Sequence, residues 1–117
     1  MGVPTVQALN LNNPTKITGT TGADYAAALA WICPALKTKT IFWKNTHGSL
    51  SVVHRLLATY GPDQTAGTEE TLVAEATLTT GQTAKWSGTG AYYKLILQVK
   101  SATNPATFEV NYSGLGA

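Results

Sequence analysis

The second half of the chain alternates apolar and polar residues with a period of two, the pattern of half-buried β-strands. Three runs show it, at residues 71–79, 92–100 and 106–112. Their apolar positions are Leu72, Ala74, Ala76 and Leu78; Tyr93, Leu95, Leu97 and Val99; and Ala106, Phe108, Val110 and Tyr112. The last two runs are close enough in sequence to predict a terminal hairpin.

A further strand is predicted at residues 38–45, a β-branched and aromatic run that ends at the turn signal of residues 45–48. Two other segments fit both periods. Residues 23–33 alternate as a strand but also carry a helical spacing behind Asp24, and residues 49–60 place apolar side chains on a possible helical face. The sequence favours a strand in both segments and leaves the helix open as the alternative.

Short strands joined by polar turns at regular spacing predict an all-β fold, an antiparallel β-sandwich of jelly-roll or Ig-like type. The 117 residues make one domain, and 44% apolar residues suffice for its core. Because Asn, Pro and Gly break any long periodicity early in the sequence, residues 1–21 are predicted to form an extended N-terminal arm, with a short strand near residues 16–19 left open. Residues 22–117 then form the sandwich.

Charge and composition limit the classes of partner. Only 12% of residues are charged and the net charge is +2, too little for clustered phosphate contacts, so we expect no nucleic-acid partner. The sequence has neither a long apolar stretch nor the basic and apolar regions of a signal peptide, so we expect no membrane partner and no export. The single cysteine, Cys33, excludes an internal disulfide and fits a reducing compartment.

The candidate chemical groups do not form a catalytic or metal-binding pattern. His47, His54 and Cys33 lack the compact spacing of a structural zinc site, and Cys33 is expected to be a small buried hydrophobe. The carboxylates fall in a polar loop or on outward strand positions, where burial would not raise their pKa values. No Gly-x-Ser-x-Gly elbow or phosphate-binding loop occurs. We therefore expect no catalytic residue, no metal, no cofactor and no enzymatic activity.

Aromatic residues indicate an alternative function. Trp31 and Trp43 are expected to anchor the core, whereas Trp86 stands beside a Ser-Gly-Thr-Gly turn and is followed closely by Tyr92. If they are exposed, Trp86 and Tyr92 could stack on sugar rings. The alternative is therefore a monomeric β-sandwich module that binds carbohydrate.

Several stretches in the last two-thirds of the chain carry a resemblance to a known class. Residues 39–45 read Lys-Thr-Ile-Phe-Trp-Lys-Asn, residues 78–83 read Leu-Thr-Thr-Gly-Gln-Thr, and residues 92–101 and 106–114 form the alternating end. With its hydroxyl-rich, cysteine-poor composition, the chain resembles the small accessory structural proteins of tailed bacteriophage particles, especially head decoration or cement proteins.

The resemblance implies a non-catalytic protein on the virion surface, made in the bacterial cytoplasm. It would bind and stabilise the outer capsid shell, commonly as a homotrimer. Its partners would be its own copies and the major capsid protein or another virion protein.

Two sets of residues are candidates for protein contacts in such an assembly. The first is the apolar part of the arm, Val3, Val6, Leu9 and Leu11. The second is a weak basic stripe that could face an acidic shell, Lys37, Lys39, Lys44 and Arg55.

Overall fold

The computed structural model describes residues 12–102 and 104–116, which form eight β-strands and the loops between them. The strands are β1 (Asn12–Thr20), β2 (Ala26–Ile32), β3 (Leu36–Asn45), β4 (Val52–Thr59), β5 (Glu70–Leu78), β6 (Thr83–Gly88), β7 (Lys94–Lys100) and β8 (Thr107–Gly116). Both ambiguous segments are strands, and the helical alternative is wrong. β2 alternates side chains between the core and the outside, with Leu29 and Trp31 buried, and β4 alternates in its first half and is buried on both faces in its second.

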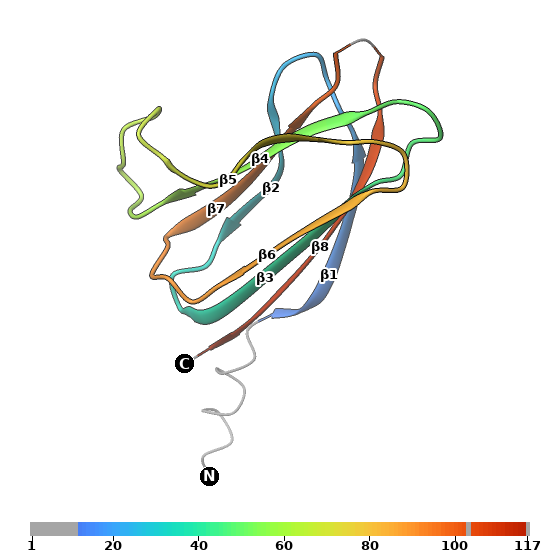
Figure 1. Ribbon diagram of the computed structural model, residues 1–117. Coiled ribbons are helices and arrows are strands. Elements are labelled where there is room, and N and C mark those ends of the chain that lie inside the picture. Colours follow the sequence, from blue (N-terminus) through green and yellow to red (C-terminus); the bar gives the residue numbers. More distant parts are fainter. Residues whose placement is uncertain (1–11, 103, 117) are drawn as a thin grey trace.

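Two four-stranded antiparallel sheets pack face to face (Figure 1). One has the order β1-β8-β3-β6 and the other β2-β7-β4-β5. Only β4 and β5 are neighbours both in sequence and in a sheet, since the other connections cross between the sheets. The predicted all-β sandwich is confirmed, and this strand order is that of a jelly roll rather than of an Ig-like domain.

The predicted terminal hairpin is wrong. β7 lies between β2 and β4, whereas β8 lies between β1 and β3 in the other sheet. The β7–β8 loop crosses beside the β1–β2 loop, where the Thr21 amide donates to the Ala106 carbonyl at 2.8 Å and the Ser101 amide to the Gly22 carbonyl at 2.9 Å. Alternation indicates which face of a strand is buried but not which strand lies beside it.

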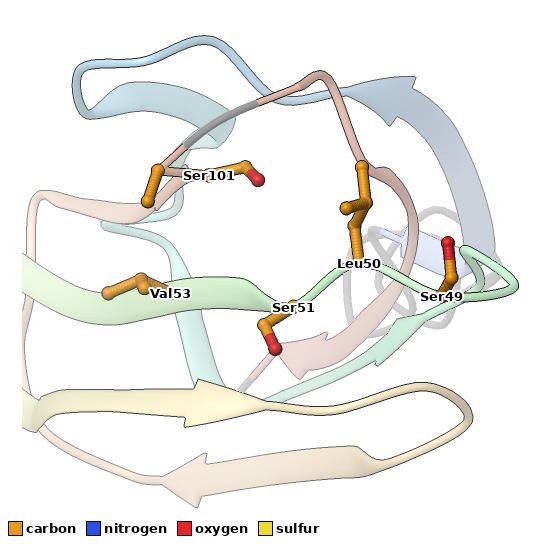
Figure 2. Close-up of a pocket in the computed structure, with 6 residues that line it drawn as sticks. Ser49, Leu50, Ser51, Val53 and Ser101 are labelled. Carbon is orange, nitrogen blue, oxygen red and sulfur yellow. The ribbon is translucent and has the colours of Figure 1, made fainter.

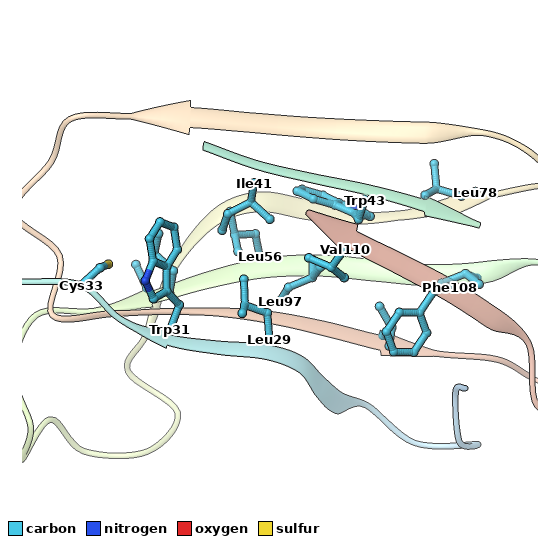
Figure 3. Packing of buried hydrophobic residues seen from close by; sticks show 14 of the residues in the cluster. Leu29, Trp31, Cys33, Ile41, Trp43, Leu56, Leu78, Leu97, Phe108 and Val110 are labelled. Atoms are coloured by element: carbon cyan, nitrogen blue, oxygen red, sulfur yellow. The ribbon is translucent and has the colours of Figure 1, made fainter. Parts of the chain in front are cut away.

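The core fills the space between the sheets with the inward positions of the strands (Figure 3). Ile41 and Trp43 of β3 are 0% and 2% exposed, and Cys33 is buried in the same cluster, as expected from the sequence. Other members of the cluster are Leu29, Trp31, Leu36, Val52, Leu56, Ala58, Leu78, Leu95, Leu97, Val99, Ala106, Phe108 and Val110. A single apolar core therefore holds the two sheets together.

The boundary between arm and sandwich lies earlier than residue 21. Residues 12–20 form β1, an edge strand that pairs with β8, and its Gly19 lies against the Phe108 ring. Pro14 falls where the β1–β8 register shifts. Proline has no amide hydrogen to donate, and a bulge on an edge strand is a position where a β-sheet tolerates this. The short strand left open at residues 16–19 is thus part of a longer strand that belongs to the sandwich, and residues 1–11 lie outside the described part of the chain.

Gly114 offers a test of the close packing between β8 and β3. A Cβ at this position would lie 2.8 Å from both Leu36 Cδ1 and the Thr38 carbonyl oxygen, so backbone must move to admit it. We expect Gly114→Ala to lower the free energy of unfolding by about 1–3 kcal/mol, measured by urea denaturation.

Gly48 is the matched control, because a Cβ there meets nothing within 4 Å. Gly48→Ala should change the same quantity by less than about 0.5 kcal/mol. Equal effects of the two substitutions would contradict the close packing at Gly114.

Candidate functional site

The loops gather at two opposite ends of the sandwich. We call the first the aromatic end: it comprises the loops at 33–35, 60–69 and 89–93, together with the start of β1 and the end of β8. In Figure 1 these loops lie at the left and bottom, near the C-terminal end of the chain. The remaining crossing loops form the opposite end.

The aromatic end brings together the two residues proposed for carbohydrate binding. Trp86, on β6, and Tyr92, before β7, have ring centroids 5.8 Å apart in an edge-to-face arrangement. Tyr60 adds a third ring, with its centroid 5.6 Å from that of Tyr92. Both predicted rings are half-buried, whereas Tyr60 is 56% exposed. The prediction did not include Tyr60, since only the pairing of β4 with β7 brings it there.

Glycines in the β6–β7 connection admit two of these rings. A Cβ on Gly88 would lie 2.5 Å from Trp86 Cζ2, and one on Gly90 would lie 2.6 Å from Tyr92 Cζ. Each ring therefore packs directly on backbone. Because Gly88 and Gly90 have no side chain, the rings of Trp86 and Tyr92 can occupy these positions against the backbone.

The third ring is held by polar contacts within its own loop. The Tyr60 amide donates to Gln64 Oε1 at 2.7 Å, and the Tyr60 hydroxyl donates to Glu70. The hydrogen bond to Glu70, together with smaller contributions from burial and the carboxylate charge, raises the pKa of Tyr60 to about 12. Tyr60 is thus neutral and restrained at physiological pH.

Lys39 is not part of a surface stripe, contrary to the prediction. It shares the inward face of β3 with Ile41 and Trp43 and is only 1% exposed. Its Nζ donates to the Gly90 carbonyl at 2.5 Å and lies 5.5 Å from the centroid of the Tyr92 ring. The buried ammonium therefore fixes the 89–93 loop rather than meeting a partner protein.

The other members of the predicted stripe do not share one surface. Lys37 is exposed beside the register shift at the start of β3. Lys44 lies on the outer face of the β1-β8-β3-β6 sheet, whereas Arg55 lies on the outer face of the opposite sheet. There Arg55 lies 4.0 Å from the Tyr25 ring centroid and its Nε donates to Gln98 at 2.6 Å.

A different basic surface emerges from the strand register. Lys16, Lys44 and Lys85 occupy outward positions of the β1-β8-β3-β6 sheet, and we call this the cationic sheet face. Glu109 lies among them and pairs with Lys16 at 3.1 Å, a contact that lowers the pKa of the Glu109 carboxyl. Sequence order conceals this face because its lysines come from three strands.

The opposite end contains a shallow pocket of about 290 Å³ (Figure 2). It is lined by hydroxyl-bearing and small apolar residues, Ser49, Leu50, Ser51, Val53, Ser101 and Ala102. None of the six is titratable. The pocket therefore offers neither a nucleophile with a base nor a charge for orienting a substrate.

The histidines and the cysteine are not brought together. His47 Nδ1 accepts the amides of Ser49 and Leu50 at 3.0 and 2.9 Å, which fixes a turn, while His54 is buried with its ring centroid 5.4 Å from that of Trp43. Burial raises the pKa of the Cys33 thiol. Within residues 12–102 and 104–116, no three His, Cys, Asp or Glu side chains are grouped so that they could hold a metal ion.

Across that part of the chain, no helix is long and apolar enough to cross a membrane. The apolar residues of the arm that are proposed to contact other proteins, Val3, Val6, Leu9 and Leu11, lie outside the part of the chain that the structure describes.

Comparisons with known proteins show the fold and no family. No protein-family model matches the chain, and neither does any curated protein. A chain of the disulfide-linked pili of Bacillus endospore appendages is similar with a TM-score of 0.54 and 16% identity, covering 90% of this chain and 87% of that one. The Yersinia pseudotuberculosis-derived mitogen is similar with a TM-score of 0.58 and 11% identity, covering 86% and 85%.

The K3 adhesin domain of Lys-gingipain from Porphyromonas gingivalis gives a TM-score of 0.56 and 10% identity, covering 87% of this chain and 74% of that one. Chains of an SPBc2 prophage-derived protein and of empty cowpea mosaic virus particles align more loosely, with TM-scores of 0.46 and 0.47. At such identities the likeness extends to the sandwich fold alone, which these proteins use in different settings.

His54 gives the sandwich a predicted dependence on pH. Burial lowers the pKa of His54 below its ordinary value of 6.5, so the unfolded chain binds this proton more tightly than the folded protein. The stability contributed by neutral His54 is complete above about pH 6.5 and is lost as the pH falls through the lower folded pKa.

We expect the free energy of unfolding to decrease from neutral to mildly acidic pH in the natural protein, and to decrease less in His54→Phe, which keeps a ring against Trp43. Urea denaturation across this pH range measures both slopes. Identical slopes would show that His54 does not titrate on unfolding.

Proposed function

We propose that this protein is a non-catalytic structural subunit of a virion, a capsid decoration protein that binds and stabilises the outer shell. The observation that carries the proposal is the apolar character of residues 1–11 and of the end of the sandwich from which they extend. The segment precedes β1, whose Asn12 pairs with Gly114 near the end of β8. It therefore starts from the aromatic end.

Residues 1–11 carry no charged side chain and include the four candidate contact residues, Val3, Val6, Leu9 and Leu11. Fully extended, they would reach about 36 Å. Two large hydrophobics near strand ends at this same end remain exposed, Ile32 of β2 (58%) and Leu115 of β8 (51%). Apolar residues on both the segment and the adjoining surface favour burial between subunits.

Charge supports a shell-facing surface on another side of the protein. The cationic sheet face carries three lysines against one glutamate, which suits an acidic capsid surface. On a lattice, many weak contacts of this kind act together, because binding of one subunit raises the effective concentration of the next contact. A homotrimer would present three such faces to the shell.

Two further considerations fit this function. Jelly-roll sandwiches are common in viral capsid domains, and the similar Bacillus chain belongs to pili, which are also assemblies of repeated subunits. A disulfide-linked assembly is not proposed for this chain, because Cys33 is 2% exposed. We place the protein on the virion surface after synthesis in the bacterial cytoplasm, with its own copies and the major capsid protein as partners.

Removing residues 1–11 tests the role of the segment. We expect the full chain to have about three times its 12.3 kDa mass in solution and the shortened chain to be a monomer. Light scattering behind a sizing column measures the mass, and thermal unfolding by circular dichroism checks that the sandwich of both chains remains intact. A full chain that stays monomeric, or a shortened chain that stays trimeric, would contradict the proposal.

A further inference from the structure

We propose that the aromatic end also carries a binding site for a neutral carbohydrate, centred on Tyr60 and flanked by Tyr92 and Trp86. The inference goes beyond the structural role and does not depend on it. It concerns a site on the β4–β6 side of this end, whereas β1, which residues 1–11 precede in sequence, lies at the other edge of its sheet.

The three rings form a row in which Trp86 and Tyr92 also pack against the edge of the core, whereas Tyr60 stands outside it. Tyr92 stands in the middle, with ring centroids 5.6 Å from Tyr60 and 5.8 Å from Trp86. Sugar rings bind such surfaces because their positively polarised C–H bonds pack on the negative faces of aromatic rings. Tyr60 is the ring most open to this contact, since 56% of the residue is exposed.

The rings are held in place before any ligand arrives. Hydrogen bonds fix Tyr60 at both its backbone amide and its hydroxyl, while Gly90 and the Lys39 ammonium position Tyr92. Trp86 lies against Gly88. Because these side chains have little freedom left to lose, binding a ligand to them costs little conformational entropy.

Burial does not explain why Tyr60 is held so firmly. Trp31 and Trp43 are 6% and 2% exposed and contribute to the core, whereas the Tyr60 ring remains largely in solvent. Its hydrogen-bonding partners, Gln64 and Glu70, come from the same loop and strand start and are not core residues. An exposed aromatic side chain restrained in this way is typical of a contact surface.

The charges around the rings select the kind of ligand. Residues 60–70 contain three carboxylates, Asp63, Glu69 and Glu70, and no lysine or arginine. The nearby ammonium of Lys39 is buried and donates to the Gly90 carbonyl. The loop therefore disfavours an anionic ligand close to Tyr60, while the Glu70 carboxylate has lone pairs beyond the one that accepts from Tyr60 and can accept hydrogen bonds from neutral sugar hydroxyls.

Titration with a defined panel tests the site. Calorimetry of the full chain with neutral hexasaccharides of glucose, N-acetylglucosamine, mannose and galactose should reveal saturable binding of at least one, with a Kd of about 1 mM or tighter. We expect Tyr60→Ala to weaken that binding by about tenfold or more, and Tyr60→Phe, which keeps the ring, to change it by less than about threefold.

Tyr25 provides the matched control. Its hydroxyl also donates to a glutamate, Glu75, but it lies before β2 at the opposite end of the sandwich. Tyr25→Ala should leave the affinity unchanged, with thermal unfolding confirming that all variants are folded. Failure of every hexasaccharide to bind, full affinity in Tyr60→Ala, or equal losses in Tyr60→Ala and Tyr25→Ala would overturn the site.

Discussion

The packing of two four-stranded sheets over one apolar core is the interaction on which the rest of the structure depends. The single cysteine cannot form an internal disulfide, and the described residues group no metal ligands, so cohesion comes from burial of side chains such as Trp43, Leu56 and Leu97. Because most connections cross between the sheets, loops from distant parts of the chain meet at each end. The aromatic end is built from such loops, and the cationic sheet face combines strands that are distant in sequence.

Strand β3 links the core to both ends through two buried polar side chains. Near its start, Lys39 donates to the carbonyl of Gly90 and fixes the aromatic end. At its last residue, the Asn45 side-chain amide donates to the carbonyls of Leu50 and Leu78 at 2.7 and 2.9 Å, and its oxygen accepts the His47 amide. Lys39 thus joins β3 to the 89–93 loop, and Asn45 joins the 46–51 loop to the end of β5.

Alternation of apolar and polar residues predicts which segments are strands and which of their faces is buried, but not which strands pair. Period two and strand propensity predict six of the strand regions, β2, β3, β4, β5, β7 and β8, and the inward positions of residues such as Leu97 and Val110, because burial on one face of a strand appears directly as period two. It does not predict β6, a short strand between two turn signals, and it indicates only a short strand within β1, where Pro14 and neighbouring asparagines resemble a loop but are compatible with a bulged edge strand. It also paired β7 with β8, since the assignment of strands to sheets depends on contacts distant in sequence.

In the candidate sites, too, local sequence signals predict some members, and contacts between distant strands determine the others. A local turn signal in the sequence indicates Trp86 and Tyr92, which do lie together, but Tyr60 joins them only through the pairing of β4 with β7. The basic stripe failed because Lys39 and Lys44 fall on opposite faces of one strand, the first inward and the second outward. Lys39 is two and four residues from Ile41 and Trp43, so the alternation along β3 predicts that all three side chains point to the same, inward face.

The proposed role in a virion depends on attachment to a shell, and co-sedimentation with tailed-phage heads stripped of their accessory proteins measures this attachment most directly. We expect the full chain to bind to saturation, with Lys85→Glu on the cationic sheet face weakening attachment by about fivefold, equivalent to about 1 kcal/mol. Lys94→Glu, an equal charge change on the opposite sheet, should leave it unchanged. Absence of the protein from the sedimented heads, or equal losses in the two variants, would contradict the account.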